Sequence, residues 1–234
     1  MAKPNVWLSV SDLMTGLMVI FLFVAISYIK RVQDSVSVLT EYVETKNRMH
    51  DKLVKEFAGD TLKWQMAIGK DLTMKFKEPT VLFATGSYEL TPRFKEILDE
   101  FLPRYFDILL NDSLSKNIQE IRIEGHTDDV PIPRYDTDPY IANAMLSQQR
   151  ALSVVRYFRS MDAFRNYTPQ QQHQLEFWLT ANGLSYGKAL DKNGDYTQQS
   201  GKPIDKDLSR RVEFRIVTTG EEVLEHFVNK KDKQ

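Results

Sequence analysis

The sequence contains no cysteine and has no excess of charge of either sign. Its 234 residues include 31 Lys and Arg and 32 Asp and Glu, for a net charge of -1. Without cysteine there is no disulfide framework, no thiolate metal site and no cysteine nucleophile. Without a basic excess the chain cannot neutralise many phosphates, so we expect no nucleic-acid partner. The sequence also lacks a P-loop, a dinucleotide fingerprint and a nucleophile–base arrangement, so we expect neither classical enzyme activity nor a cofactor.

Long apolar runs are also scarce, with one exception near the N-terminus. The mean hydropathy of -0.40 excludes a protein with many membrane spans. Residues 6–29, however, contain a single ionisable side chain and carry Trp7 and Tyr28 near their ends. As a helix rising ~1.5 Å per residue, this run crosses a hydrocarbon core of ~30 Å. It is too long for a signal peptide and no A-x-A site follows, so we predict an uncleaved transmembrane helix over 6–29 after a short tail, 1–5.

The segment 30–75 is predicted to be a helical stalk or linker. It contains no proline, and apolar residues recur in it at steps of three and four: Val32, Val36, Leu39, Val43, Leu53 and Phe57. Lys46 and His50 interrupt this stripe. Two interpretations therefore stay open, a helix that pairs with a copy of itself near the membrane and a helix that packs back on its own domain.

A separate domain is predicted over residues 76–220. Alternating apolar residues predict strands at four places, 79–83, Ile121–Ile123, Leu175–Leu179 and Val212–Ile216. Helical spacing predicts helices over 94–109, with a kink at Pro103, and over 146–161, and a C-terminal helix within the tail 221–234. Strands that alternate with helices over this length indicate an α+β sandwich with a sheet on one side and helices on the other.

Asp12 is the acidic residue inside the predicted span. A carboxylate in the membrane costs ~2.5–3.5 kcal/mol, so such groups usually face a protein partner or a water path. A medium of low dielectric favours the neutral acid, so we expect Asp12 to bind a proton there and to lose it where water enters. Ser9, Ser11 and Thr15 supply nearby hydroxyls, and Gly16 permits close helix approach. The alternative is an interfacial Asp12 that caps a shorter helix.

A second candidate site lies where the Ile121–Ile123 strand ends. Asp128 follows this strand, Arg150 lies on the first turns of the next helix, and Arg210 opens the last strand. A carboxylate and a guanidinium so placed can close one polar pocket, which suits a zwitterion carrying an ammonium and a carboxylate. The alternative is a structural Asp–Arg pair that holds the loop. His126 is interpreted as a packing residue, because no second histidine stands at ligand spacing, and no metal site is predicted.

Three motifs in this domain together resemble those of OmpA-like peptidoglycan-binding domains. They are Gly125-His126-Thr127-Asp128, Asn143-x-x-Leu146-Ser147-x-x-Arg150-Ala151 and Arg210-Arg211-Val212-Glu213. The resemblance covers about residues 76–220 and implies a βαβαβ-type sandwich that binds the diaminopimelate of the cell-wall peptide. It implies that Asp128 takes the ammonium and Arg150 the carboxylate, in a site lined also by Thr127, Asn143, Leu146 and Arg210.

Two features depart from the family pattern. Ser209 stands before the arginine pair, where the family usually has asparagine, and this bears on the role of Arg210. The segment Pro131–Tyr140 contains three prolines and predicts a rigid loop over the pocket.

The N-terminal segment resembles the span of flagellar stator B subunits of the MotB type. The motif Ser11-Asp12-Leu13-Met14-Thr15-Gly16-Leu17-Met18, followed by Phe21-Leu22, places Asp12 at the ion-carrying aspartate. The short N-terminal tail and the residues of this motif resemble the ZorB family, the MotB-like subunits of Zorya anti-phage systems, more than flagellar MotB. That resemblance implies a single-pass inner-membrane protein with a cytoplasmic N-terminus and a periplasmic OmpA-like domain. It also implies a homodimer, a ZorA-like ring of MotA-like multi-span subunits as partner, and protons as coupling ion, with sodium left open.

Two functions from different classes follow. In the first, the chain is a motor subunit: two copies anchored to peptidoglycan pass protons through Asp12 and act on the surrounding ring, in anti-phage defence or as a flagellar-type stator. In the second, it is a passive membrane-anchored peptidoglycan tether in which Asp12 is incidental. Composition does not separate the two.

Overall fold

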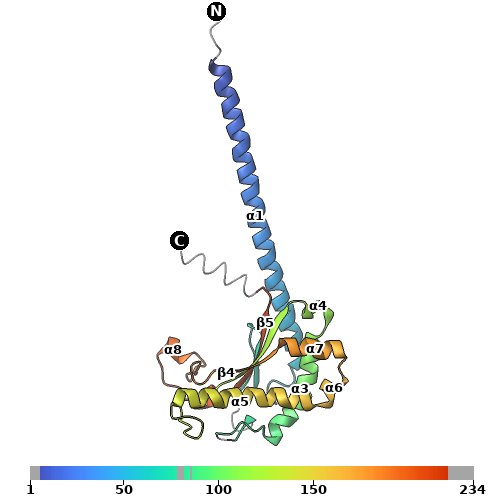
Figure 1. The fold of residues 1–234 in the computed structure, drawn as a ribbon, viewed down its shortest axis with the longest axis vertical. Coiled ribbons are helices and arrows are strands. Elements are labelled where there is room, and N and C mark those ends of the chain that lie inside the picture. Colours follow the sequence, from blue (N-terminus) through green and yellow to red (C-terminus); the bar gives the residue numbers. More distant parts are fainter. Residues whose placement is uncertain (1–5, 78–81, 85, 221–234) are drawn as a thin grey trace, which may run out of the picture. The chain divides into compact units, whose positions relative to one another are not determined.

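The computed structural model describes residues 6–77, 82–84 and 86–220. Residues 1–44 and 45–234 form two compact units. The first unit holds the N-terminal part of helix α1, whose bounds are Val6–Phe57 (Figure 1). Its segment Val10–Asp34 is long and apolar enough to cross a membrane, with a mean hydropathy of 2.1. Val32, Val36 and Val43 are also exposed in this unit.

The second unit is built on a five-stranded sheet in the order β1-β2-β5-β3-β4. The strands are β1 (Met66–Ile68), β2 (Thr73–Phe76), β3 (Ile118–Gly125), β4 (Leu179–Gly183) and β5 (Val212–Thr218). Strands β3 and β4 run parallel, and the other neighbours are antiparallel. A parallel pair needs a crossover connection, which the helices after β3 provide.

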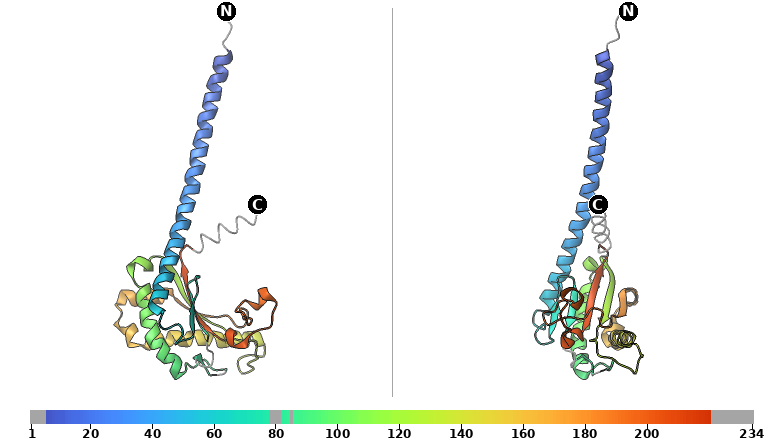
Figure 2. Two further views of the ribbon diagram at one scale, coloured as in Figure 1. Left: turned by 180° about the vertical axis from the view of Figure 1, so that it is seen from behind. Right: turned by 90° about the vertical axis from the view of Figure 1, so that its left-hand side faces the viewer.

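The described helices of this unit differ widely in length. They are α3 (Pro92–Leu109), α4 (Asp112–Ser115), α5 (Pro139–Ser160), α6 (Asp162–Asn166), α7 (Pro169–Trp178), α8 (Thr197–Ser200) and α9 (Lys206–Ser209). Figures 1 and 2 place α8 near the start of α5, and α6 and α7 near its end. Pro103 lies inside α3, and the assigned helix continues past it.

The helices cover one face of the sheet with an aromatic core. On that face Phe76 of β2 and Phe214 of β5 each lie 5.1 Å, between ring centroids, from Phe101 of α3. Helix α3 in turn meets α5 through Phe106 and Phe158, whose rings stack 4.2 Å apart. Residues that alternate with these along the strands carry charged side chains. The predicted α+β sandwich is thus confirmed.

The compact unit begins earlier than residue 76, where the sequence predicts its start. Strands β1 and β2 belong to the sheet, and the end of α1 is part of the core. Leu53 and Phe57 are fully buried, and the Phe57 ring lies 5.2 Å from that of Phe101. These two residues of the apolar stripe therefore pack back on their own domain. Burial of the end of α1 against α3 makes this segment part of the domain, so the domain begins before residue 76. Strands β1 and β2 were not predicted because strands this short show little alternation of apolar residues.

The strand predicted at Leu175–Leu179 is a helix for most of its length. Thr168 and Gln171 form a capping box at the start of α7, with Pro169 at the first helical position. Leu175 and Trp178 are buried, while Phe177 is 74% exposed. Burial at a spacing of three residues is the pattern of a helix and not of a strand. Of the strand expected over 79–83 only residues 82 and 83 are described, and the predicted C-terminal helix lies outside the described residues.

The burial of the end of α1 yields a test on two neighbouring side chains. Leu53→Ala should lower the free energy of unfolding by ~2–5 kcal/mol, because it leaves a cavity in the core. Val54→Ala removes a side chain that is 38% exposed and should have a much smaller effect. Chemical denaturation of the full chain in detergent measures both. Equal losses for the two variants would contradict this account of α1.

Candidate functional site

A close approach between helix α5 and the sheet positions the candidate site. Gly125 at the end of β3 and Gly183 at the end of β4 are partners in the parallel register. A Cβ atom on Gly125 would lie 2.1 Å from the carbonyl oxygen of Ser147, and one on Gly183 would lie 2.4 Å from the backbone nitrogen of Gln148. Only glycine fits at both positions, so α5 presents its N-terminal half directly at the strand ends. Sequence analysis did not single out Gly183.

All six predicted wall-binding residues line one cavity of about 420 Å³. They come from the segment after β3, from α5 and from the end of α9 just before β5, and they are Thr127, Asp128, Asn143, Leu146, Arg150 and Arg210. Phe83, Gly86 and residues 130–134 complete the lining. The segment predicted to form a rigid loop over the pocket therefore contributes part of the wall, including Pro131 and Pro133.

Asp128 is a buried carboxylate that already has a cationic partner. Its Oδ2 accepts a hydrogen bond from Nη1 of Arg210 at 2.8 Å, and its Oδ1 accepts one from the backbone N–H of Val130 at 3.0 Å. Arg210 also donates from Nη2 to Asp207 at 2.5 Å. An ammonium that enters the cavity would share Asp128 with Arg210.

Arg150 is a buried guanidinium that faces the cavity with spare donors. It is 6% exposed; its Nε donates to the carbonyl of Ser87 at 2.9 Å, and its guanidinium lies 5.0 Å from the centroid of the Phe83 ring. Burial lowers the pKa of Arg150 to about 10, with Asp128 opposing and Arg210 adding to this shift. The side chain still carries its charge at neutral pH, so it can bind a carboxylate.

Asn143 and Thr127 bring unused polar atoms to the cavity lining. The Nδ2 of Asn143 donates to the carbonyls of Val130 and Pro139, both at 3.0 Å, which fixes the orientation of the amide. Within the described part of the chain, Oδ1 of Asn143 and Oγ1 of Thr127 are buried without a hydrogen-bond partner. Buried polar atoms of this kind are usually satisfied, so their position favours a ligand that supplies donors.

A cationic residue of the loop, Arg134, also lines the cavity, although it lies in none of the motifs that predicted the site. Its Nη2 donates to the carbonyl of Gly86, and its guanidinium lies 4.8 Å from the centroid of the Tyr135 ring. The loop then enters α5 through Asp138, whose Oδ1 accepts from the backbone N–H of Tyr140 at 2.7 Å. The Asp138-Pro139 pair is a helix-start signal that could have placed this end of the loop.

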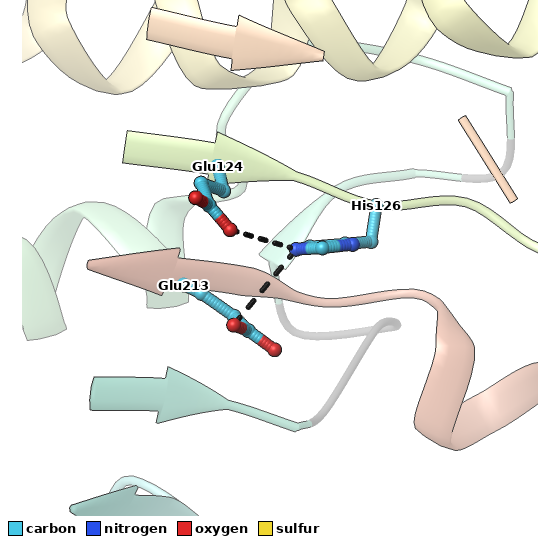
Figure 3. Close-up of side chains that lie close together, drawn as sticks. All are labelled: Glu124, His126 and Glu213. Carbon is cyan, nitrogen blue, oxygen red and sulfur yellow. Dashed lines mark ion pairs between the residues drawn. The ribbon is translucent and has the colours of Figure 1, made fainter. Parts of the chain in front are cut away.

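A buried cluster of one histidine and two glutamates lies beside the cavity residues in the sequence. Glu124 and Glu213 are partners in the β3–β5 register, and the ring of His126 directs one nitrogen toward both carboxylates (Figure 3). Nε2 of His126 lies 3.6 Å from Glu124 Oε2 and 4.0 Å from Glu213 Oε2. Two like charges directly opposite on a sheet are unfavourable, so the cluster needs cations.

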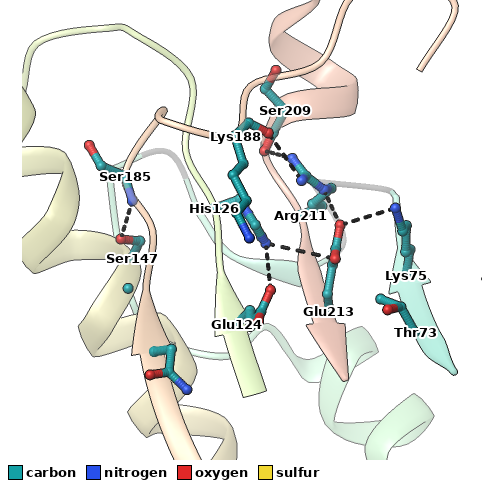
Figure 4. A network of polar contacts seen from close by, with 12 residues as sticks. Thr73, Lys75, Glu124, His126, Ser147, Ser185, Lys188, Ser209, Arg211 and Glu213 are labelled. Atoms are coloured by element: carbon teal, nitrogen blue, oxygen red, sulfur yellow. Dashed lines mark hydrogen bonds and ion pairs between the residues drawn. The ribbon is translucent and has the colours of Figure 1, made fainter. Parts of the chain in front are cut away.

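Arg211 supplies the cation for this cluster. Its Nε donates to Glu213 at 2.5 Å, and its Nη1 and Nη2 donate to the carbonyls of Ser209 and Lys188, each at 3.2 Å (Figure 4). One ligand atom from each of the two carboxylates and the imidazole lies within 4.8 Å of the others, a spacing that suits a metal ion. A metal-bound imidazole normally donates from its other nitrogen, however, and Nδ1 of His126 has no such partner among the described residues. We interpret the cluster as a structural network.

Asp12 lies in the other unit, on the apolar part of α1. Its side chain is exposed, and with Leu13, Gly16, Leu17 and Ile20 it lines a shallow hollow on the helix surface. Nothing lies within 4 Å of the place where a Cβ atom of Gly16 would stand. This face combines an acid with a small residue, which permits close approach of another helix.

Comparisons with known proteins agree with this architecture. Residues 82–198 match the OmpA family. The chain is 37% identical over 221 residues to the Zorya protein ZorB of Escherichia coli strain Crooks, covering 92% of this chain and 88% of that protein. A Zorya protein ZorB of a second Escherichia coli strain is 25% identical over 221 residues, covering 92% and 81%. A MotB-like protein from Desulfovibrio vulgaris has a similar fold, with a TM-score of 0.50, 24% identity, and coverage of 76% of this chain and 98% of that one.

The buried His126 predicts how stability depends on pH. Burial lowers the pKa of His126 below its ordinary value of 6.5, and the positive charge of Arg211 lowers it further. Glu124 and Glu213 oppose this shift but do not reverse it. The folded state therefore holds fewer protons than the unfolded state, so stability falls as pH drops below about 6.5. The pKa of Glu213 is lowered as well, because Arg211, His126 and Lys75 outweigh its burial, and its contribution is lost only at lower pH.

We expect the melting temperature to fall between pH 7.5 and pH 5.5, and His126→Gln to remove most of that fall. His173→Gln, on the exposed face of α7, is the matched control and should keep it. Thermal denaturation at the two pH values measures the effect. The same pH dependence in all three proteins would show that His126 is not its source.

Proposed function

Because the chain belongs to the ZorB family of Zorya proteins and contains an OmpA domain, we propose that it is the peptidoglycan-anchored subunit of an ion-driven membrane motor that acts in anti-phage defence. The observation that carries this proposal is that the six residues predicted to form one wall-binding site all line a single cavity. The same chain has a helix with a segment long and apolar enough to cross a membrane, and Asp12 is the single acidic residue within its apolar run 6–29.

The cavity suits the zwitterionic end of diaminopimelate in the cell-wall peptide. Arg150 offers a charged guanidinium for the carboxylate, while Asp128 attracts the ammonium. Asn143 Oδ1 and Thr127 Oγ1 are buried acceptors that the same ammonium can satisfy. Leu146 and the proline-containing loop give the apolar part of the wall against which the carbon chain of the ligand packs.

Asp12 is proposed to carry the coupling ion. A motor driven by the membrane potential gains ~2.3 kcal/mol per charge for each 100 mV, provided that a titratable group moves the charge. Asp12 is the only Asp, Glu, His, Lys or Arg between Lys3 and Lys30. No other side chain of this span can do the work, and a carboxylate makes protons the expected ion, with sodium as the alternative to test.

These roles imply an arrangement in the cell. The N-terminus lies in the cytoplasm, α1 crosses the inner membrane once, and the OmpA domain binds the wall in the periplasm. The exposed side chains Val32, Val36 and Val43 leave an apolar stripe for a second copy of the chain. The face around Asp12 and Gly16 meets a MotA-like multi-span subunit, a ZorA-like ring.

The alternatives are a flagellar-type stator and a passive tether. The 37% identity to a Zorya protein over 92% of the chain favours the Zorya motor over the flagellar one. A tether would bind peptidoglycan equally well, so only the function of Asp12 separates it from a motor.

Wall binding is tested at Arg150. Arg150→Ala should cost ~2–5 kcal/mol of binding, the scale for truncating one member of a buried charge pair. Arg156→Ala removes an exposed arginine from the same helix and should bind normally. Co-sedimentation of the full chain in detergent with purified sacculi gives the readout. Equal retention of wild type and Arg150→Ala would reject the site.

Ion coupling is tested at Asp12. Asp12→Asn keeps the size of the side chain but removes titration, so we expect membrane insertion, dimerisation and partner assembly to persist while phage protection is abolished. Asp34→Asn, which removes an exposed carboxylate at the end of the apolar segment, should keep protection. Protection by a Zorya operon carrying each variant is measured with membrane levels in parallel. Full protection by Asp12→Asn would favour the tether.

A further inference from the structure

The ionisable side chains that line the cavity are unequal in sign. In the described part of the chain they are one carboxylate, Asp128, and three guanidinium groups, Arg134, Arg150 and Arg210. A single zwitterion brings one charge of each sign, so it leaves the balance of the cavity unchanged. The excess of cationic groups indicates a ligand with more carboxylates than ammonium groups.

Arg210 does not contribute to this excess. Its guanidinium is bound by Asp128 at 2.8 Å and by Asp207 at 2.5 Å. These two carboxylates more than balance its charge. A ligand carboxylate would therefore have to compete with both acids to reach Arg210.

Arg150 and Arg134, in contrast, have no carboxylate within 4.0 Å in the described part of the chain. Their hydrogen-bond partners are neutral: Arg150 donates to the carbonyl of Ser87, and Arg134 donates to the carbonyl of Gly86 and to the hydroxyl of Tyr135 at 3.1 Å. Both partner carbonyls belong to one short segment beside the cavity. Two guanidinium groups with unsatisfied charge thus line the same space.

The acids of the loop do not neutralise Arg134, because they bind backbone groups instead. Asp136 accepts from the N–H of Asp138 at 2.9 Å, and Asp138 accepts from the N–H groups of Tyr140 and Ile141 at the start of α5. Hydrogen bonds of this kind hold both carboxylates in the loop and at the helix start.

We propose that Arg134 forms a second carboxylate-binding subsite, so that the ligand is a stem peptide that carries a free carboxylate on the residue next to diaminopimelate. This inference rests on the proposed binding of peptidoglycan and names the class of peptide selected. Arg150 takes the carboxylate of diaminopimelate, and Arg134 takes the free carboxylate of the residue beside it. In L-alanyl-γ-D-glutamyl-meso-diaminopimelate that group is the α-carboxylate of D-glutamate. Amidation of this group to D-isoglutamine removes its charge and hence its attraction to Arg134.

The test compares two synthetic tripeptides that differ only in this group, the D-glutamate form and the D-isoglutamine form. Isothermal titration calorimetry with the full chain in detergent micelles gives both dissociation constants. Wild type should bind the D-glutamate form about tenfold more tightly, the scale of one charge-assisted hydrogen-bonded contact. Arg134→Gln should lose this preference by weakening only the D-glutamate form, and Arg134→Lys should restore part of it.

Arg93→Gln is the control, since this arginine pairs with Glu96 on α3 and does not line the cavity. It should bind both peptides as wild type does. Equal affinity of wild type for the two peptides would overturn the subsite, as would an equal loss of both in Arg134→Gln, which would indicate a structural role for the loop. Failure of wild type to bind either peptide would instead overturn the peptidoglycan-binding function, and the subsite with it.

Discussion

The contact of α5 with Gly125 and Gly183 is the constraint on which the candidate site depends. Two strand ends without side chains let the helix backbone approach the sheet to a distance that no Cβ atom would allow. The approach brings Asn143 and Arg150 of α5 to the segment that follows β3. It also lets the hydroxyl of Ser147 accept the N–H of Ser185 at 3.1 Å, while the carbonyl of Ser185 accepts the N–H of Thr127 at the same distance. These contacts position the cavity, in which Oδ1 of Asn143 and Oγ1 of Thr127 have no hydrogen-bond partner among the described residues.

The buried charges next to this cavity explain how the start of β5 is held. Arg211 is 2% exposed, and it binds Glu213 and two backbone carbonyls, so it ties the segment before β5 to the segment around Lys188. The backbone N–H of His126 donates to the backbone carbonyl of Arg211 at 3.0 Å. Arg210 is the neighbour of Arg211 in the chain, and it is therefore brought to Asp128 by a network that does not itself face the cavity.

Sequence patterns predicted the features that depend on local spacing. The apolar helix, strands β3 and β5, the long helix α5 and the six residues of the cavity all follow from periodicity or from motifs. The short strands β1 and β2 and the burial of Leu53 and Phe57 did not, because they depend on packing between segments distant in sequence. The error at α7 has another cause: Leu175, Phe177 and Leu179 alternate in the sequence, but the capping box at Thr168 starts a helix that continues to Trp178. Gly183 and Arg134 were missed because each matters through a contact that spacing alone does not reveal.

The two functional regions differ in how their charges are satisfied. In the domain, the carboxylate of Asp128 is buried with Arg210 and a backbone N–H, so the cost of removing it from water is offset within the chain. Asp12 has no such partner among the described residues, and it stands in a segment of mean hydropathy 2.1. An anchor needs only the apolar length of that segment, and an acid within it makes insertion less favourable. The proposed contact with a second membrane subunit would offset this cost, because it would give Asp12 the partner that it lacks among the described residues.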